Sequence, residues 1–273
     1  MGNLGDPTPQ QERSKVEDDM SALQVDRPTL TINSTNPSKL AEYERILGRP
    51  VAGTKLAVPE MQMESEFAKP VKEHRDGGDP FDNYPYKAAA AELASNKAKA
   101  AFNLFNGPVL IEDTWISLHG LRGEPGPFYS QWGNSTYNQD LCNRVHLLPP
   151  LTGEEVNDRA TAIVTLAIWK GDPDCPPDVY QGVVAGRIAK APRGENGFGW
   201  DSIFIPLADD GSPAFCHVDP VTGDVLVDVD GAPVGKTYAE MTPEEKDSIS
   251  MRARALHAFM QRSPGFGSGA VDL

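Results

Sequence analysis

The pattern of apolar and polar positions predicts both strands and helices. The alternating, β-branched segment "PTLTINS" (Pro28–Ser34) is typical of a strand. The segment "PVLIEDTWISL" (Pro108–Leu118) starts as a buried strand, and the runs Ala160–Gly171 and Val179–Ala189 predict two neighbouring strands joined by the turn "GDPDCPPD". These segments, together with the helices below, indicate an α/β protein.

Three segments have the period of an amphipathic helix. Asn36 can cap the first of them, and Gly48 can end it. An Ala-rich helix is predicted over Lys87–Phe105. The last helix, Thr242–Met260, opens with a capping box and carries an apolar stripe.

The segments between and beyond these elements set the domain organisation. We expect one domain over residues 27–262, between a disordered tail over 1–26 and a flexible tail over 263–273. Clusters of Pro, Gly and Asp mark two insertions, near 67–86 and 208–235. The second insertion can form a hairpin that turns at "PVTGD".

Charge and cysteine content exclude several classes of protein. A formal net charge of -14 argues against a nucleic-acid partner, which needs a basic surface. The three scattered cysteines, Cys142, Cys175 and Cys216, form neither a disulfide framework nor a zinc motif and fit a reducing compartment. No run approaches the about 18 apolar residues of a membrane span, and the first residues lack the apolar core of a secretory signal. We therefore expect a cytoplasmic protein with no membrane partner.

The joint between the first strand and the first helix is a candidate phosphate site. It carries Ser34, Thr35, Asn36, Ser38 and Lys39. Backbone N–H groups and the helix dipole favour an anion at such a joint, and a lysine adds positive charge. These residues can equally serve as helix caps and nothing more, and the local sequence does not decide between the two.

Acidic residues follow apolar runs at two places. Glu112 and Asp113 stand where the apolar run of their strand stops, and Glu60 lies in a strand or at its exit. Magnesium needs one or two carboxylates when substrate phosphates supply further oxygens. The acids and the phosphate site could therefore be the two halves of a Mg²⁺–nucleotide site, although a solvated strand end is the simpler interpretation of Glu112 and Asp113 taken alone.

Several stretches together resemble the inosine triphosphate pyrophosphatase family, which hydrolyses non-standard purine nucleoside triphosphates to the monophosphate and pyrophosphate. The resemblance extends from about Leu30 to Met260, apart from the insertions. It is carried by "STNPSKLAE", "VPEMQMESE", "VLIEDT", "GEPGPF", "GRIAKAPRGENGFGWDSIF" and "KTYAEMTPEEKDSISMRARAL". The combination of "FGWD" with "TYAEM" and the final helix is far more specific than a lone glycine motif.

The resemblance implies an elongated two-lobed fold, with a central mixed sheet flanked by helices and the nucleotide in a cleft between the lobes. It implies a Mg²⁺-dependent enzyme, with Mn²⁺ able to replace Mg²⁺, that cleanses the nucleotide pool of triphosphates such as ITP, dITP and XTP. A homodimer is expected on the same ground. Two alternatives stay open: a pyrophosphatase of the same fold with changed base specificity, and a nucleotide-binding protein without catalysis.

Roles for single residues follow from the same resemblance. The catalytic group would comprise Lys39, Lys97, Glu112 and Asp113, with Asp113 ligating metal or activating water, and Glu60 and Asp113 would hold the metal. Phe198 would stack on the base. The full set implied at the substrate is Ser34, Thr35, Asn36, Lys39, Thr114, Phe198, Trp200, Asp201, Lys246, Ser250, Met251 and Arg252.

Three positions depart from the family's pattern. Met251 stands where the family commonly has a histidine, and a thioether cannot donate a hydrogen bond to a purine oxygen. Thr35 replaces a usual glycine, so the backbone approaches phosphate less freely. Trp115 replaces a small residue and could fill the pocket, although packing in the core is the better interpretation.

Overall fold

The computed structural model describes residues 29–58, 84–121, 123–126, 129, 136–147 and 157–263. The tail predicted over 1–26, most of the tail predicted over 263–273 and most of the insertion predicted over 67–86 lie outside these residues.

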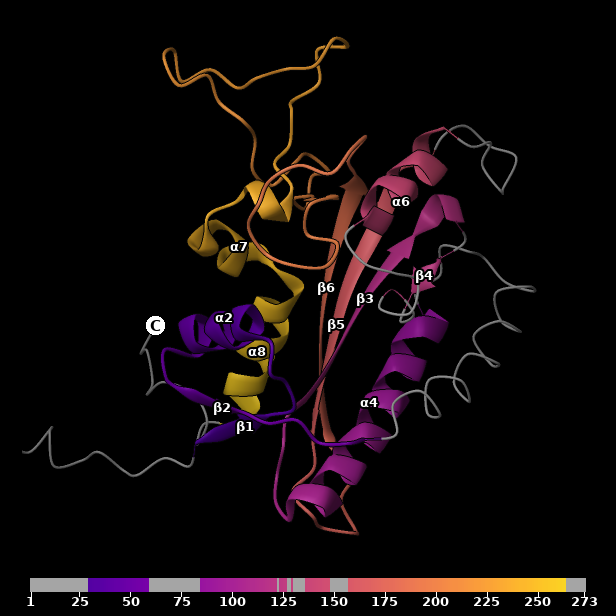
Figure 1. The fold of residues 1–273 in the computed structure, drawn as a ribbon, viewed down its shortest axis with the longest axis vertical. Helices are drawn as coiled ribbons and strands as arrows, with labels where there is room; N and C mark the ends of the chain where they lie inside the picture. Colours follow the sequence, from indigo (N-terminus) through magenta and orange to yellow (C-terminus); the bar gives the residue numbers. More distant parts are fainter. Residues whose placement is uncertain are drawn as a thin grey trace, which may run out of the picture.

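A five-stranded sheet forms the centre of the fold, in the order β4-β3-β5-β6-β7 (Figure 1). Its strands are β3 (Ile111–Leu118), β4 (Pro125–Gly126), β5 (Arg159–Ile168), β6 (Asp178–Ile188) and β7 (Phe204–Pro206). Every neighbouring pair is antiparallel, so the prediction of a mixed central sheet is wrong. A short turn joins β5 to β6 as predicted, and such a turn can join only antiparallel strands.

A separate parallel pair lies beside this sheet. It consists of β1 (Leu30–Ile32) and β2 (Val51–Gly53), which are joined by α2 (Pro37–Leu47). Ile32 also forms a parallel bridge with Leu110, the residue before β3. The end of β1 and the start of α2 are thereby held next to the start of β3.

Helices cover both faces of the central sheet (Figure 1). On one face α4 (Tyr84–Phe105) packs its alanines on Ile111 and Ala167, which fits the Ala-rich helix expected there. On the other face α8 (Met251–Arg262) packs on the alternate residues of β5 and β6, and α2 packs against α8. The remaining helices are α6 (Thr136–His146), α7 (Pro243–Ile249) and the 3-10 turns η1 (His119–Leu121) and η2 (Tyr238–Glu240).

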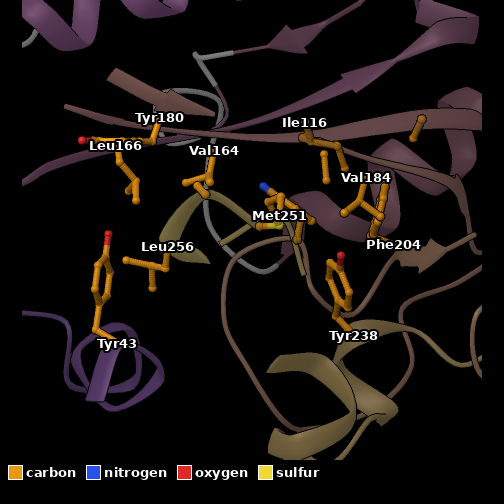
Figure 2. Close-up of a cluster of buried hydrophobic side chains, with 14 of the residues drawn as sticks. Tyr43, Ile116, Val164, Leu166, Tyr180, Val184, Phe204, Tyr238, Met251 and Leu256 are labelled. Atoms are coloured by element: carbon orange, nitrogen blue, oxygen red, sulfur yellow. The ribbon is translucent and has the colours of Figure 1, made fainter. Parts of the chain in front are cut away.

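The core on the α8 face is the larger one. Figure 2 shows part of it, with Met251 in the middle and the hydroxyls of Tyr43 and Tyr238 pointing toward the sheet. The chain of α8 lies very close to β6 at Gly182, where any side chain would collide with the backbone of Met251. This close approach fixes the start of α8 against the sheet.

Residues 208–235, which we call the arm, project beyond α7 (Figure 1). The hairpin expected at "PVTGD" is present, because Val218 and Val225 form an antiparallel bridge around the turn. Residues 220–233 are all exposed. The arm therefore adds little to the core.

Candidate functional site

Alternation along β3 separates the two central acids. Glu112 and Thr114 face α2 and α8, whereas Asp113 faces α4, because successive side chains of a strand point to opposite faces. Both acids lie near the start of an eight-residue strand. The expectation that they end the strand is wrong, because the apolar pattern resumes at Trp115 and continues to Leu118.

The joint between β1 and α2 lies beside these acids. Asn36 caps α2 by accepting hydrogen bonds from the backbone of Ser38 (3.0 Å) and Lys39 (3.2 Å). Ser34 accepts a bond from the backbone N–H of Asn36 (3.2 Å), and Thr35 is exposed. The capping interpretation is thus confirmed for Asn36, and phosphate binding by Ser34, Thr35 and Asn36 stays a prediction.

Six charged side chains form one network between α2, β3 and the last two helices. Its carboxylates are Glu42, Glu112 and Asp201, and its cations are Lys39, Lys246 and Arg252. The formal charges therefore sum to zero. Buried ions need such pairing, since an unpaired charge in the interior is strongly destabilising.

Glu112 is the acceptor at the centre of this network. Its side chain is 1% exposed, and Arg252 contacts it through Nε (2.8 Å) and Nη2 (2.9 Å). Lys39 Nζ lies 3.0 Å away, and the hydroxyls of Thr114 (2.9 Å) and Tyr43 (2.7 Å) both donate to it. Burial lowers the pKa of Arg252 to about 9, which leaves the guanidinium charged at neutral pH.

Glu42 completes the network and was missed by the sequence analysis. It accepts a hydrogen bond from Lys246 (2.6 Å) and a close contact from Arg252, and it is 4% exposed. Lys246 also donates to Asp201 (2.8 Å). The signal available in the sequence was spacing, because Glu42 lies one helical turn after Lys39 and therefore on the same face of α2.

The segment expected to be one long helix is two helices. Ser250 has an extended backbone (φ -66°, ψ 154°), which ends α7 and starts α8. Its side chain caps α8 by accepting from the backbone of Ala253 (3.1 Å). The break turns Lys246 on α7 and Arg252 on α8 toward the same buried acid, Glu42. Substrate binding by Ser250 stays a prediction.

A pocket of about 140 Å³ opens beside the network. Its lining combines aromatic rings, which offer flat apolar surfaces, with donors that carry positive charge. Phe198 lies near both cations, with Lys246 Nζ 5.1 Å and Arg252 Cζ 5.5 Å from the ring centre. The lining residues are Lys39, Thr114, Tyr129, Phe198, Gly199, Trp200, Asp201, Met251 and Arg252.

The loop that carries Phe198 is held by side chains beneath it. Asp201 accepts the backbone N–H of Phe198 (2.8 Å), and Trp200 packs edge-on against Phe204. Asn138 is 2% exposed and ties the loop to α6 by donating to the carbonyl of Gly199 (2.8 Å). No residue of α6 was predicted at the site from the sequence.

Tyr129 forms another wall of the pocket and was also missed. Its hydroxyl donates to Asn138 (2.7 Å), so one asparagine holds both this wall and the loop. Burial raises the pKa of Tyr129 to about 12, and the nearby charge of Asp201 acts in the same direction. The hydroxyl is therefore protonated at neutral pH and acts as a donor.

Asp113 pairs with Lys97 of α4 on the opposite face of β3. Lys97 Nζ lies 2.8 Å from Asp113 Oδ1, and the two side chains are 2% and 15% exposed. Between the bridge at Leu110 and the pairing of β4 at Ile116, β3 pairs only with β5 within the described part of the chain. The pocket, which Thr114 lines, lies on one face of this stretch of β3, and the pair formed by Lys97 and Asp113 lies on the other.

The metal site predicted from Glu60 and Asp113 is described only in part, because Glu60 lies outside the described residues. Among the described residues, no three His, Cys, Asp or Glu side chains gather closely enough to hold a metal ion by themselves. Mg²⁺ can be held by one or two carboxylates plus phosphate oxygens. The carboxylate of Asp113 fits that donor set as one of the ligands.

Comparison with known proteins places the chain in a family. The model of the Ham1 family matches residues 30–220 and 226–262. The chain belongs to the Ham1 family. "Inosine triphosphate pyrophosphatase 2" of Trypanosoma cruzi is 32% identical over 84% of this chain and 89% of its own length. The "dITP/XTP pyrophosphatase" of Symbiobacterium thermophilum is 30% identical over 86% of this chain and 94% of its own length. The resemblance seen in the sequence is confirmed.

Solved Ham1 structures share the fold. A HAM1 protein from Coxiella burnetii superposes with a TM-score of 0.54 at 23% identity, over 86% of this chain and 98% of that chain. The Staphylococcus aureus Ham1 protein gives a TM-score of 0.50 over 87% of this chain. The likeness covers the helix-flanked sheet, and the two-lobed cleft stays a prediction.

Two departures from the Ham1 pattern are placed by the structure. Trp115 is 1% exposed and packs with Ala90 and Ile163 on the α4 face, so its interpretation as a core residue is confirmed. Met251 is 2% exposed and lines the pocket, where it brings a thioether beside Arg252.

None of the helices in the described part combines the length and hydropathy that crossing a membrane would demand.

Proposed function

We propose that this Ham1 protein hydrolyses non-standard purine nucleoside triphosphates, such as ITP, dITP and XTP, to the monophosphate and pyrophosphate. The observation that carries the proposal is the aromatic pocket lined by Lys39 and Arg252, on the face of β3 opposite the pair formed by Lys97 and Asp113. The names of the Ham1 relatives support the same reaction and the same substrates.

The base enters the pocket in this proposal. Phe198 provides the face on which a purine stacks, and Trp200 fixes the loop that holds it. Arg252 keeps N–H groups beyond those that contact Glu112 and Glu42, and these can donate to a carbonyl oxygen of the base. Donors at this place favour hypoxanthine and xanthine, which carry an oxygen where adenine carries an amine.

The triphosphate extends from the pocket past β3 toward Asp113. Lys39 lies on the pocket side of this strand and Lys97 on the other, so their ammonium groups flank the path. An oxygen of water bonds to the α-phosphorus while the bond to the bridging oxygen breaks, and the two lysines stabilise the charge that grows on that oxygen. Asp113 accepts a hydrogen bond from the attacking water and orients it, and the proton that the water loses as the new P–O bond forms passes through this carboxylate to solvent.

Asp113 and Glu60 would hold Mg²⁺, or Mn²⁺ in its place, together with phosphate oxygens. When bound, the ion supplies positive charge that neutralises the phosphates and stabilises the leaving pyrophosphate. Homodimer formation and a cytoplasmic location belong to the same proposal. Three free cysteines fit a reducing compartment.

The direct test is pyrophosphate release from a panel of ribo- and deoxynucleoside triphosphates. We expect kcat/KM for inosine and xanthosine triphosphates to exceed that for adenosine triphosphate at least about ten-fold, and EDTA to abolish the activity. Excess Mg²⁺ should restore it. Preference for another base would instead support a changed specificity, and binding without turnover would support a non-catalytic nucleotide-binding protein.

The arm gives a second prediction. None of its residues lines the described pocket, so removing it should leave base preference unchanged. Cys216 and Gly235 pair across its base, which allows residues 217–234 to be replaced by the two-residue turn Asn-Gly. We expect the ratio of kcat/KM between inosine and adenosine triphosphates to stay within about two-fold. A larger change would show that the arm reaches the substrate.

A further inference from the structure

Tyr43 lies beneath the network and has no role in the reaction as described so far. It stands on α2 one turn after Lys39, and it is fully buried. In Figure 2 its ring rises from α2 and its hydroxyl points toward the sheet. Burial, followed by the charge of Glu112, raises its pKa well above the usual value, so the hydroxyl keeps its proton.

The hydroxyl of Tyr43 donates to Glu112 Oε2 at 2.7 Å. That oxygen also accepts from Arg252 Nε, whereas Lys39 and Thr114 contact Oε1. The ring of Tyr43 lies 5.9 Å from Arg252 Cζ. The side chain of Tyr43 therefore contacts both the carboxylate of Glu112 and the guanidinium of Arg252, which that carboxylate holds.

The donors to Glu112 differ in how firmly they are placed. Lys39 is 19% exposed and lines the pocket, so a phosphate can draw it away from the carboxylate. Arg252 and Tyr43 are buried and stay. Once Lys39 leaves, the hydroxyl of Tyr43 is a neutral donor that still restrains Glu112 on the side of Arg252.

We propose that Tyr43 is a positioning residue for substrate binding. Through Glu112, Tyr43 keeps the guanidinium of Arg252 oriented toward the pocket. It also keeps the carboxylate of Glu112 in place when Lys39 moves from Glu112 to the triphosphate. The inference rests on the proposed function, because it assigns Lys39 to phosphate and Arg252 to the base. Tyr43 does not itself line the pocket.

The test compares Tyr43→Phe with a matched control, Tyr180→Phe. Tyr180 is also buried in the core, and its hydroxyl lies 3.2 Å from Ser263 Oγ, remote from the network. Both variants remove one buried hydroxyl and keep the ring. We expect Tyr43→Phe to raise KM for inosine triphosphate about ten-fold with kcat within about three-fold, and Tyr180→Phe to leave both unchanged.

A purely structural role would lower the melting temperature of both variants and leave KM unchanged in both, which would overturn the proposal. A double-mutant cycle supplies the second measurement. In a Glu112→Gln background Tyr43→Phe should change KM less than about two-fold, since its effect acts through Glu112. A ten-fold rise in KM from Tyr43→Phe in the Glu112→Gln background would also overturn the positioning role of Tyr43.

Failure of the proposed function gives a different result. The wild-type protein would then release no pyrophosphate from any triphosphate, whatever stands at position 43. The same variants would in that case be compared by calorimetric binding of inosine triphosphate. A ten-fold weaker Kd for Tyr43→Phe alone supports the positioning role, and equal affinities contradict it.

Discussion

Replacing Asp113 with asparagine should lower kcat for inosine triphosphate hydrolysis by about 10²–10⁴-fold, the usual contribution of a group that assists proton transfer. The side chain keeps its size and can still accept from Lys97, which lies 2.8 Å away. It loses the negative charge that orients water and would hold Mg²⁺. Release of pyrophosphate at saturating substrate measures the change.

The matched control for this variant is Asp178→Asn. Asp178 also pairs with a lysine, at 2.7 Å from Lys170, but both side chains are well exposed at 42% and 60%. An exposed pair of this kind contributes little to stability, and it lies outside the pocket lining. Activity of Asp113→Asn within three-fold of the control would remove Asp113 from the centre of the reaction.

Much of the fold was predictable because local rules agree with the packing. The Asn36 cap, the Ala-rich helix and the pair of strands around "GDPDCPPD" are all local patterns, and all are present. The mixed sheet was wrong because strand direction depends on which strands become neighbours. Within the described residues the first strand pairs with β2 and is bridged to Leu110, just before β3, and no local pattern in the sequence predicts that arrangement.

The break at Ser250 shows a limit of periodicity. Ile249 and Leu256 both belong to the apolar stripe that predicted a single helix. The backbone is nevertheless extended at Ser250, which is both the C-cap of α7 and the N-cap of α8. A serine inside an apolar stripe can cap a second helix, since its hydroxyl competes for backbone N–H groups. The sequence therefore allowed two helices as well as one, and the start of the second helix lies against Gly182 of β6.

The site was predictable where a residue type carries its own chemistry. Lys39, Phe198 and Arg252, which the resemblance implied at the substrate, line one pocket, and their roles there stay predictions. The supporting residues Glu42 and Asn138 were missed because their importance comes from burial and from partners far along the chain. Glu42 pairs with a lysine 204 positions later, and Asn138 bonds a carbonyl 61 positions later.

Replacing Glu42 with alanine should have the largest effect on stability. Lys246 and Arg252 are 5% and 1% exposed, and both contact Glu42. Its removal leaves a net positive charge in the buried network, and losing one partner of a buried pair costs about 3–5 kcal/mol of unfolding free energy. At about 2–4 °C per kcal/mol, the melting temperature should fall by roughly 6–20 °C.

Asp247→Asn is the matched control, because Asp247 pairs with Arg45 on the same two helices at 2.6 Å, where the arginine side chain is 37% exposed. It should cost about 1 kcal/mol or less. Glu42→Gln keeps the shape and restores part of the hydrogen bonding, so its unfolding free energy should lie between those of the wild type and Glu42→Ala. If Glu42→Ala has the same melting temperature as Asp247→Asn, the network does not hold α2 against the last two helices. The position of the Arg252 guanidinium at the pocket must then come from Glu112.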